Sequence, residues 1–499
     1  MTSINSDFMS QLALRSLGNS SNMMTQAMER LSTGKRVNSA ADDAAGLGIA
    51  TKLKAQVNSL NAASRNATDA LALIGTIDGA LEESSEILLR MRELAVQSAS
   101  DTNTGTDRSF IQDEINQLNN ELNRISSSTE FNSVKLLDGT YNNKQIQIGT
   151  SANQVFNIGV TSTDAATLGA YQMESLAEHN TAAAADAAAA VTLSDALINV
   201  AANYTVKGSF GSTTVNVAAG DDAKTVAQSF NLAAGTTGIT AAAITKAQIT
   251  AVSNETYSFT LKGKSSTAST VNATVTSATN LTALKDAINS VSGATGITAA
   301  LTEDLSGVNL VQQDGFDIIV GDVTSSGSGT MSLAAANKNG VVSQSTVALG
   351  GTTTLDSQVI IGQISLSSHK AFTVTSGNAA NHFHTTTDAK TSSLETMGAV
   401  DISSQTGATN ALSVIDGAIA MVSEIRSEMG AAENRLTSTV DNLSNVSVNT
   451  QRSLTAVEDA NFASETSALT KAQILQQAAT SMLAQANKAK QTMLVLLQG

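Results

Sequence analysis

The residues of this chain that could carry out chemistry are few and scattered. The chain has no cysteine, which excludes disulfides, thiolate metal sites and cysteine nucleophiles. Among its four histidines, His179, His369, His382 and His384, only the last two have a spacing that hints at a metal, and exposed loop histidines are the commoner explanation. There is no HExxH sequence, no serine in a histidine and aspartate setting, and no phosphate-binding glycine loop. We therefore expect a protein that is not an enzyme, with no metal and no cofactor.

Two adjacent carboxylates, Asp42 and Asp43, stand out in the segment 31–50, LSTGKRVNSAADDAAGLGIA. Apolar helical patterns lie on both sides of it. Its glycines, at positions 34, 46 and 48, allow backbones to approach closely, and the carboxylates can cap a helix start or complement its dipole. An ordinary interhelical loop would explain the segment, and so would a junction that holds two helices at a fixed angle. Whether the carboxylates serve as caps or as contacts between subunits is open at this stage.

The elements on either side of this segment are predicted to be long helices. Apolar residues step helically from Ile4 to Leu31, and a seven-residue repeat runs without a miss from Leu53 to Ala95. A second helix is predicted near 111–125. Helical periodicity resumes at Leu412 and continues, after the segment EDANFASE, to the end of the chain.

Between the helical ends, alternation predicts β-structure. A hairpin region is expected around 134–160, with a turn at Asp138 and Gly139. From 177 to 402 the composition shifts to Ala, Thr, Ser and Gly, and the pattern repeats itself: Gly238 and Gly296 mark equivalent points of two units. Each unit is predicted to hold a strand pair, a short helix and a returning strand. The fold class is therefore α+β, a nested rod with long terminal helices forming a coiled-coil core and a β-rich inserted outer region.

Composition limits the partners and the compartment. The chain has 499 residues, 41% hydrophobic and only 3% aromatic, with no tryptophan and no proline. Long unbroken helices exclude proline, and a chain that must refold quickly after unfolded export would also avoid slow X–Pro isomerisation. A net charge of −15 argues against nucleic acid. No apolar run approaches the roughly 20 residues of a membrane span. The start MTSINSDFMSQ lacks the basic and apolar regions of a secretory signal, so an exported protein would need another route.

Several long motifs resemble those of bacterial flagellin, the subunit of the flagellar filament. The N-terminal ones are the segment 31–50, RELAVQSAS at 92–100 and FNSVKLLDG at 131–139. The C-terminal ones are NRLTSTVDNLSN at 434–445, EDANFASE at 458–465, and KAQILQQAATSMLAQAN at 471–487 with the final MLVLLQG. They occur in the family's order and cover about the first 160 and last 95 residues. The insert matches only loosely, although TALKDAINSVSGATGITA resembles a small module often found there.

The resemblance implies a polymer subunit that is secreted unfolded through the flagellar type III route and resides in the extracellular filament. Residues 1–42 with 457–499 would form an inner-core coiled coil, and 43–176 with 403–456 an outer-core helical domain with a β-hairpin. Residues 177–402 would form a variable outer insert, possibly of two subdomains. The implied partners are further copies of the chain, a flagellar export chaperone, and cap and junction proteins, with no nucleic acid and no membrane.

The resemblance also implies two groups of site residues. Arg90, Leu94 and Glu114 match the epitope that Toll-like receptor 5 recognises in similar flagellins, although Leu89 departs from the glutamine common in strongly recognised members. Host innate immune receptors are therefore expected partners. The C-terminal leucines match those sensed by cytosolic inflammasome receptors, but helix packing is their expected primary role. The residues expected to serve polymerisation or packing are Ile4, Phe8, Leu12, Asp42, Asp43, Ile474, Met482, Met493, Leu494, Leu496 and Leu497.

Other functions compete with this one. A hook–filament junction protein has similar terminal helices but usually lacks the full 31–50 and 92–100 motifs. A secreted adhesin or enzyme carried on the β-rich insert would need a site in 177–402, where no chemically shaped constellation is found. A plain coiled-coil protein would have no β-rich insert. The sequence therefore favours a filament subunit for swimming motility.

Overall fold

A computed structural model gives the fold. It describes residues 8–175, 180–184, 202–218, 220–265, 267–302, 304–342, 346–351, 355–377, 383 and 389–497. The chain divides into two compact units. Unit 1 comprises Met1–Gly75, Asn143–Gly159 and Gly430–Gly499, and unit 2 comprises Thr76–Asn142 and Val160–Met429. The division into three domains made from the sequence stays a prediction.

Among the described residues, five long helices form at the positions that periodicity predicts. They are α1 (Phe8–Thr33), α2 (Ala44–Ser98), α3 (Gly105–Ser128), α8 (Gln405–Glu458) and α9 (Phe462–Leu497). The seven-residue repeat of α2 is its buried seam: from Leu60 to Ala95 every member is at most 4% exposed, while Leu53 is half-buried. The prediction of a long helix with a coiled-coil-like seam is therefore confirmed, because the repeat places one side chain on the same face at every second turn.

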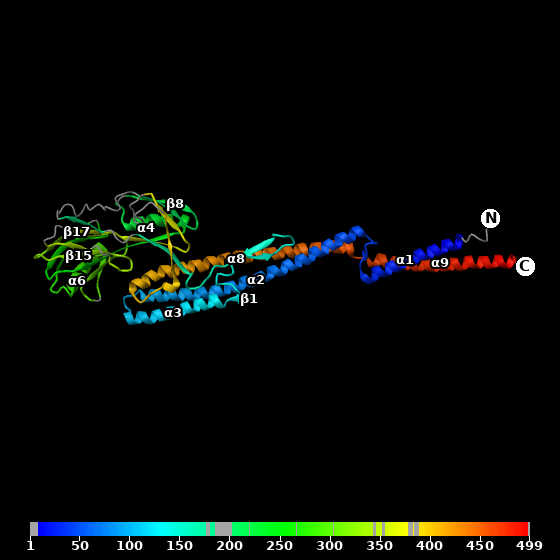
Figure 1. Cartoon of the computed structure of the whole chain (residues 1–499), viewed down its shortest axis with the longest axis horizontal. Helices are drawn as coiled ribbons and strands as arrows, with labels where there is room; N and C mark the ends of the chain where they lie inside the picture. Colours follow the sequence, from blue (N-terminus) through cyan, green and yellow to red (C-terminus); the bar gives the residue numbers. More distant parts are fainter. Residues whose placement is uncertain are drawn as a thin grey trace. The chain divides into compact units, whose positions relative to one another are not determined.

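Unit 1 pairs the two ends of the chain. Helices α1 and α9 lie side by side (Figure 1), and α1 continues through Gly18 without a break. The hairpin of β3 (Lys144–Gln147) and β4 (Val155–Ile158) confirms the alternation seen in the sequence. It rests on the helices of this unit: the Asn66 amide donates to the Gln147 carbonyl at 2.9 Å, and the Arg435 guanidinium lies 5.0 Å from the centre of the Phe156 ring.

The helical part of unit 2 is tied together by apolar packing and ion pairs. Helix α3 begins with a capping box in which Thr104 and Asp107 bond to each other's backbone N–H groups. Arg92 Nε lies 2.6 Å from Asp416 Oδ1, and Arg426 Nε lies 2.8 Å from Asp78 Oδ1, which links α2 to α8. The short strands β1 (Glu130–Phe131) and β2 (Val134–Lys135) follow α3.

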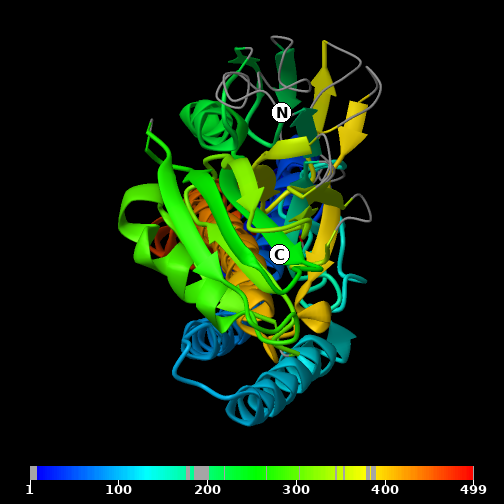
Figure 2. The ribbon, with the colours of Figure 1, turned by 90° about the vertical axis from the view of Figure 1, so that its left-hand side faces the viewer.

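Among the described residues, the β-rich part of unit 2 holds three sheets (Figure 2). All the described strand pairs are antiparallel. The four-stranded sheet has the order β20 (Ala389–Thr391), β19 (Thr373–Ser376), β7 (Ala202–Lys207) and β8 (Ser212–Val217). The five-stranded sheet has the order β11 (Ser269–Thr274), β10 (Thr256–Lys262), β14 (Ile318–Ser325), β17 (Leu355–Ile360) and β6 (Asn180–Ala184).

The eight-stranded sheet is organised by one long strand, β9 (Thr240–Thr250). The main path has the order β12 (Ile297–Leu301), β13 (Val308–Gln312), β9, β18 (Gln363–Ser368), β5 (Gly169–Glu174) and β21 (Ser393–Thr396). The first half of β9 pairs with β18, and its second half lies between β13 and β15 (Met331–Ala336), which in turn carries β16 (Val347–Leu349). The 3₁₀ turn η1 (Met397–Ala399) leads from β21 toward α8.

The predicted repeat is present as two modules. In the first, the hairpin of β7 and β8 is followed by α4 (Ala223–Leu232), α5 (Ala234–Thr237) and β9; in the second, β10 and β11 are followed by α6 (Thr282–Ser290), α7 (Ser292–Thr295) and β12. Gly238 and Gly296 end α5 and α7 in the left-handed conformation, with φ of 73° and 70°. The Asn231 side chain bonds to both backbone groups of Ala241, and Asn289 does the same with Ala299. This part of the sequence-based prediction is confirmed in detail.

One of the described helices, α8, contains a window that is long and apolar enough to cross a membrane by length and composition. The sequence shows no uninterrupted apolar run near the length of a membrane span, but the prediction did not consider a window that tolerates some polar residues. Core helices of other proteins pass the same test, so this window does not by itself indicate a membrane span.

Candidate functional site

The segment 31–50 forms the junction between α1 and α2. Helix α1 ends at Thr33, and Gly34 takes a φ of +71°, a conformation that costs glycine little and ends helices commonly. The chain then leaves the helix direction, and Val37 is buried at 3% exposure. The next helix, α2, begins at Ala44.

The backbone of this junction pairs with the break between α8 and α9. Arg36 N donates to the Glu458 carbonyl at 2.7 Å, and Ala460 N donates to the Gly34 carbonyl at 2.9 Å. Lys35 and Asp459 thus form an isolated antiparallel bridge. Two side chains reinforce it: Lys35 Nζ bonds to the Glu458 carboxylate, and Arg36 Nη2 donates to the Val457 carbonyl at 2.7 Å. The two helix breaks, more than 400 residues apart in sequence, are therefore held in one register.

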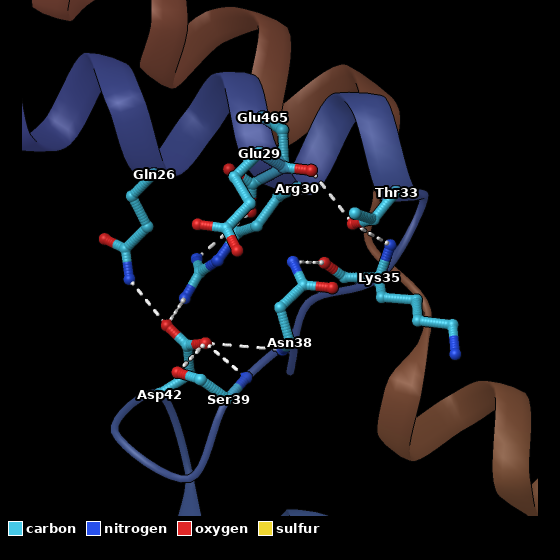
Figure 3. A network of polar contacts seen from close by, with 9 residues as sticks. All are labelled: Gln26, Glu29, Arg30, Thr33, Lys35, Asn38, Ser39, Asp42 and Glu465. Atoms are coloured by element: carbon cyan, nitrogen blue, oxygen red, sulfur yellow. Dashed lines mark hydrogen bonds and ion pairs between the residues drawn. The ribbon is translucent and has the colours of Figure 1, made fainter.

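Asp42 is the centre of a polar network within this junction (Figure 3). Its Oδ2 accepts from Ser39 N and Ser39 Oγ, both at 2.9 Å, and from Asn38 N at 3.3 Å, while Gln26 Nε2 on α1 donates to Oδ1 at 3.1 Å. These hydrogen bonds, that from the Ser39 hydroxyl first, favour the ionised form and lower the pKa of Asp42 below its usual 3.8.

Arg30 extends the network to the C-terminal helix. Its Nη1 lies 3.3 Å from Glu465 Oε1 in the first turn of α9, and its Nη2 lies 4.0 Å from Asp42 Oδ1. A carboxylate in the first turn of a helix also complements the helix dipole. One guanidinium thus links α1, the junction and α9.

Asp43 has a separate role from Asp42. Its Oδ1 accepts from Gly46 N at 2.8 Å, which makes it the N-cap of α2. A Cβ at Gly46 would lie 2.3 Å from Asp43 Oδ2, so the glycine leaves room for the cap. The close approach predicted at Gly34 and Gly48 is not found among the described residues, since a Cβ at either position would meet no atom within 4 Å.

The helix pair that the junction joins carries many apolar side chains outward. On α1, Phe8 is 71% and Leu12 52% exposed; on α9, Ile474 and Met482 are each 60% exposed. Small residues, Ala27, Ala472 and Ala479, are buried in this unit instead. Ile4 lies outside the described residues. Met493, Leu494, Leu496 and Leu497 belong to the backbone of α9, but their side chains lie outside the described set.

The residues that match the receptor epitope lie on α2 and α3. Arg90 donates from Nε and Nη2 to Glu114 Oε1 at 3.0 and 2.9 Å, and from Nη1 to Glu93 Oε2 at 2.9 Å. The bonds with Glu93 and then Glu114 raise the pKa of Arg90. Its neighbour Leu94 is only 2% exposed, so its side chain belongs to the helical core, whereas Leu89 is 51% exposed.

The structure adds site residues that periodicity did not single out, above all Arg30, Glu465 and Glu458. The acidic residues of EDANFASE lie next to a helix start and could have indicated such ion pairs. Their basic partners lie more than 400 residues away in the sequence, so local spacing could not identify them. Among the described residues, no group of three or more histidine or acidic side chains is placed to hold a metal. His382 and His384 lie outside that set.

These observations fit a structural protein of the self-assembling kind: its two ends are joined by a polar junction and carry large exposed apolar side chains. Comparison with known proteins agrees. The bacterial flagellin N-terminal helical region matches residues 4–142, the C-terminal helical region matches 412–497, and the flagellin hook IN motif matches 258–314.

Full-length relatives identify the family. The chain is 34% identical to the B-type flagellin of Pseudomonas aeruginosa, with 99% of each chain covered. It is 32% identical to a flagellin of Salmonella choleraesuis, again over 99% of both chains. A solved structure of FliC from Burkholderia pseudomallei is 17% identical and covers 73% of this chain and 99% of its own, with a TM-score of 0.30.

The chain belongs to the bacterial flagellin family. It is a structural subunit of the flagellar filament, which serves motility, and its place is the flagellum. The hook–filament junction protein is the less supported alternative, because flagellins match this chain over 99% of its length at identities such as 34% and 29%.

Proposed function

We propose that the outward apolar faces of α1 and α9 are the surfaces through which this subunit polymerises. The observation that carries the proposal is the exposure of large apolar side chains on both helices, Phe8 and Leu12 on one and Ile474 and Met482 on the other. Their burial between copies would stabilise a polymer by about 25 cal/mol per Å² of apolar surface. From the resemblance alone, we assign the same role in polymerisation to Ile4, Met493, Leu494, Leu496 and Leu497.

In this proposal the domains follow the family arrangement. Residues 1–42 with 457–499 form the inner core that lines the filament lumen, 43–176 with 403–456 form the surrounding tube, and 177–402 face solvent. Asp42 and Asp43 act within each subunit: they fix the chain direction between inner and outer core, so that every copy presents its apolar faces in the same way.

Folding of the terminal helices is coupled to assembly. The subunit leaves the cell unfolded by the flagellar type III route, aided by an export chaperone, and folds its ends at the tip against cap or junction proteins and earlier subunits. A helix pair with large exposed apolar side chains suits this route, because the cost of ordering the ends is offset only when the neighbours cover them.

Recognition by innate immune receptors would use the surface of Arg90 and Glu114. Both side chains are about half exposed, at 50 and 45%, and they are joined by an ion pair that fixes their geometry. Leu94 would contribute by supporting the helix from beneath, since it is buried.

Ile474 offers a direct test of the polymerisation surface. We expect Ile474→Asp to abolish filament growth from seeds, because a charge would be buried without a partner between copies, while Ile474→Leu should retain growth. Electron microscopy and sedimentation of seeded protein measure the outcome. Normal growth of the aspartate variant would overturn the proposal; far-UV circular dichroism of the monomer checks that both variants remain equally folded.

A further inference from the structure

A cavity of about 370 Å³ lies in unit 2 between the eight-stranded sheet and the first turns of α8. Its origin can be seen in the packing. At Gly417 the helix touches strand β5 directly, since a Cβ there would lie 2.5 Å from Ala170 Cβ and 2.8 Å from the Gly169 carbonyl. The small residues Ala241 and Ala420 are among those that line the gap beside this contact.

The sheet turns a polar face toward this gap. Strand β18 alternates: Ile364 and Leu366 are fully buried in the core of the first module, so Ser365 and Ser367 point to the opposite face, where they line the cavity. Neither serine hydroxyl is bonded to another described residue. Two hydroxyls that can each donate and accept are therefore available to a bound molecule.

The remaining polar groups of the cavity are held in place. Gln172, 5% exposed, donates from Nε2 to Ser413 Oγ at 2.8 Å and accepts from Lys338 Nζ at 2.9 Å. Asp416 is neutralised by Arg92, whose Nε lies 2.6 Å from Oδ1. The lining is thus preformed, hydrogen-bonding and without an unpaired charge, which is the condition for orienting a neutral ligand.

An exposed aromatic ring stands beside the cavity. Phe210, in the turn between β7 and β8, is 66% exposed, and its ring centre lies 6.0 Å from that of His369. It also lies against Gly238, where a Cβ would be 3.0 Å from the ring. His369 and Gly238 both line the cavity. The electron-rich face of such a ring attracts the weakly positive C–H groups of a ligand.

We propose that this cavity binds a pyranose sugar, either free or as the terminal unit of a glycan. The volume lies within the range of about 300–1,000 Å³ that small-molecule sites have. Hydroxyls, a fixed amide and a carboxylate match a ring of sugar hydroxyls, and the phenyl ring matches its C–H face. An anion would find no unpaired cation here, because Arg92 is paired with Asp416 and Lys370 with Glu424. An apolar ligand would leave the serine hydroxyls unsatisfied.

Saturation-transfer difference NMR on the full chain tests the proposal. The probes are D-glucose, D-galactose, D-mannose, L-fucose and N-acetyl-D-glucosamine, each with its methyl glycosides, at up to about 10 mM, which detects a millimolar Kd. At least one sugar should give ring-proton signals. Ser367→Leu and Ala420→Leu fill the cavity and should each abolish them, and Phe210→Ala should weaken binding at least about fivefold. Ser258→Leu, the same change at a half-buried strand serine of the second module, should leave binding intact.

The outcomes are decisive in both directions. Absence of binding by all the probes, or binding that persists in both cavity-filling variants, overturns the proposal. Because a leucine at position 367 could disturb the sheet, the double variant Ser365→Ala/Ser367→Ala provides a milder test: it should keep the melting temperature and weaken binding. If a methyl glycoside binds, the site accepts the terminal sugar of a glycan. If only the free sugars bind, the ligand is a free sugar.

Discussion

The paired helices α1 and α9 differ from the first β-rich module in how far their largest apolar side chains are buried. In the module, the rings of Tyr204, Phe230 and Phe383 are fully buried, with centroids 5.7 to 5.8 Å apart. In the helix pair, Phe8 is 71% and Met482 60% exposed. One region completes its core within the chain, and the other leaves its largest apolar groups exposed, where neighbouring copies would cover them in the proposed polymer.

The polar groups of the junction, unlike the exposed apolar side chains of α1 and α9, find their partners within the chain. The junction closes its network within the subunit: Asp42 is surrounded by donors from its own loop and from α1, and the segment after Gly34 pairs with the segment after Glu458. Hydrogen bonds depend on geometry, so the junction sets the register of the ends when they fold, whereas apolar burial is non-directional and would supply the association in the proposed polymer. In the proposed polymer, the polar junction therefore orders the single chain, and the apolar helix faces hold the copies together.

The largest effect is expected from removing α1. Deletion of residues 1–40 should abolish filaments in seeded electron microscopy, because α9 then loses its partner and the exposed apolar side chains of α1 are lost. Calorimetry should still show the melting transition of the β-rich modules, whose cores do not include these residues. Filaments formed by the shortened chain would contradict the role given to the ends, and loss of the module transition would contradict their independence.

Phe230→Ala should produce the opposite result. The side chain is 1% exposed and packs against two rings, so its loss should lower the free energy of unfolding of the first module by about 3–5 kcal/mol. Seeded filament growth should continue at a temperature below the lowered transition. If the variant fails to polymerise while its module is folded, the two regions are coupled more closely than proposed.

The repeated asparagines compare the two modules with each other. Asn289 holds Ala299 by two hydrogen bonds of 2.8 Å at a partly buried position, and Asn231 holds Ala241 in the same way at an exposed one. We expect Asn289→Ala to lower the free energy of unfolding by about 1–3 kcal/mol. Asn231→Ala should lower it less, because water can replace the lost hydrogen bonds at the exposed position. Chemical denaturation of each variant measures the free energy of unfolding. A larger loss of stability in Asn231→Ala than in Asn289→Ala would show that exposure does not determine the cost.

A smaller effect is expected at the cap of α2. Asp43→Ala removes the acceptor for Gly46 N and should destabilise unit 1 by about 1 kcal/mol. Asp43→Asn keeps an oxygen at the same place and serves as the control. Thermal melting followed by circular dichroism distinguishes the two, and equal melting temperatures would show that the cap is dispensable.

The smallest expected effect is the pH dependence at Asp42. Its pKa is lowered in the folded chain, so its contribution to stability is present above the usual 3.8 and is lost as the pH falls below 3.8 through the lower folded value. Asp42→Asn should therefore make the junction less sensitive to acid in that range. Backbone hydrogen exchange near Ser39 at several pH values measures this, and identical profiles for both proteins would exclude Asp42 as the titrating group.

The sequence predicted the elements well where a period was sustained over many residues. The repeat from Leu53 to Ala95 located α2, and the similarity around Gly238 and Gly296 located the two modules, because both signals come from local spacing that each element imposes on its own residues. The sequence was less informative about the role of a single residue whose side chain can make several kinds of contact. Asp42 and Asp43 are neighbours of the same type, and only the structure shows that one centres a network and the other caps a helix.

What the sequence determined by itself was the class of each element and, through motifs at both ends, the flagellin family. What only the tertiary structure decided was which distant groups meet: Arg30 with Glu465, Lys35 with Glu458, and the serines of β18 with the first turns of α8. Periodicity reports the environment of a face but not the identity of what covers it. That identity depends on the closure of the whole chain, which brings together residues hundreds of positions apart.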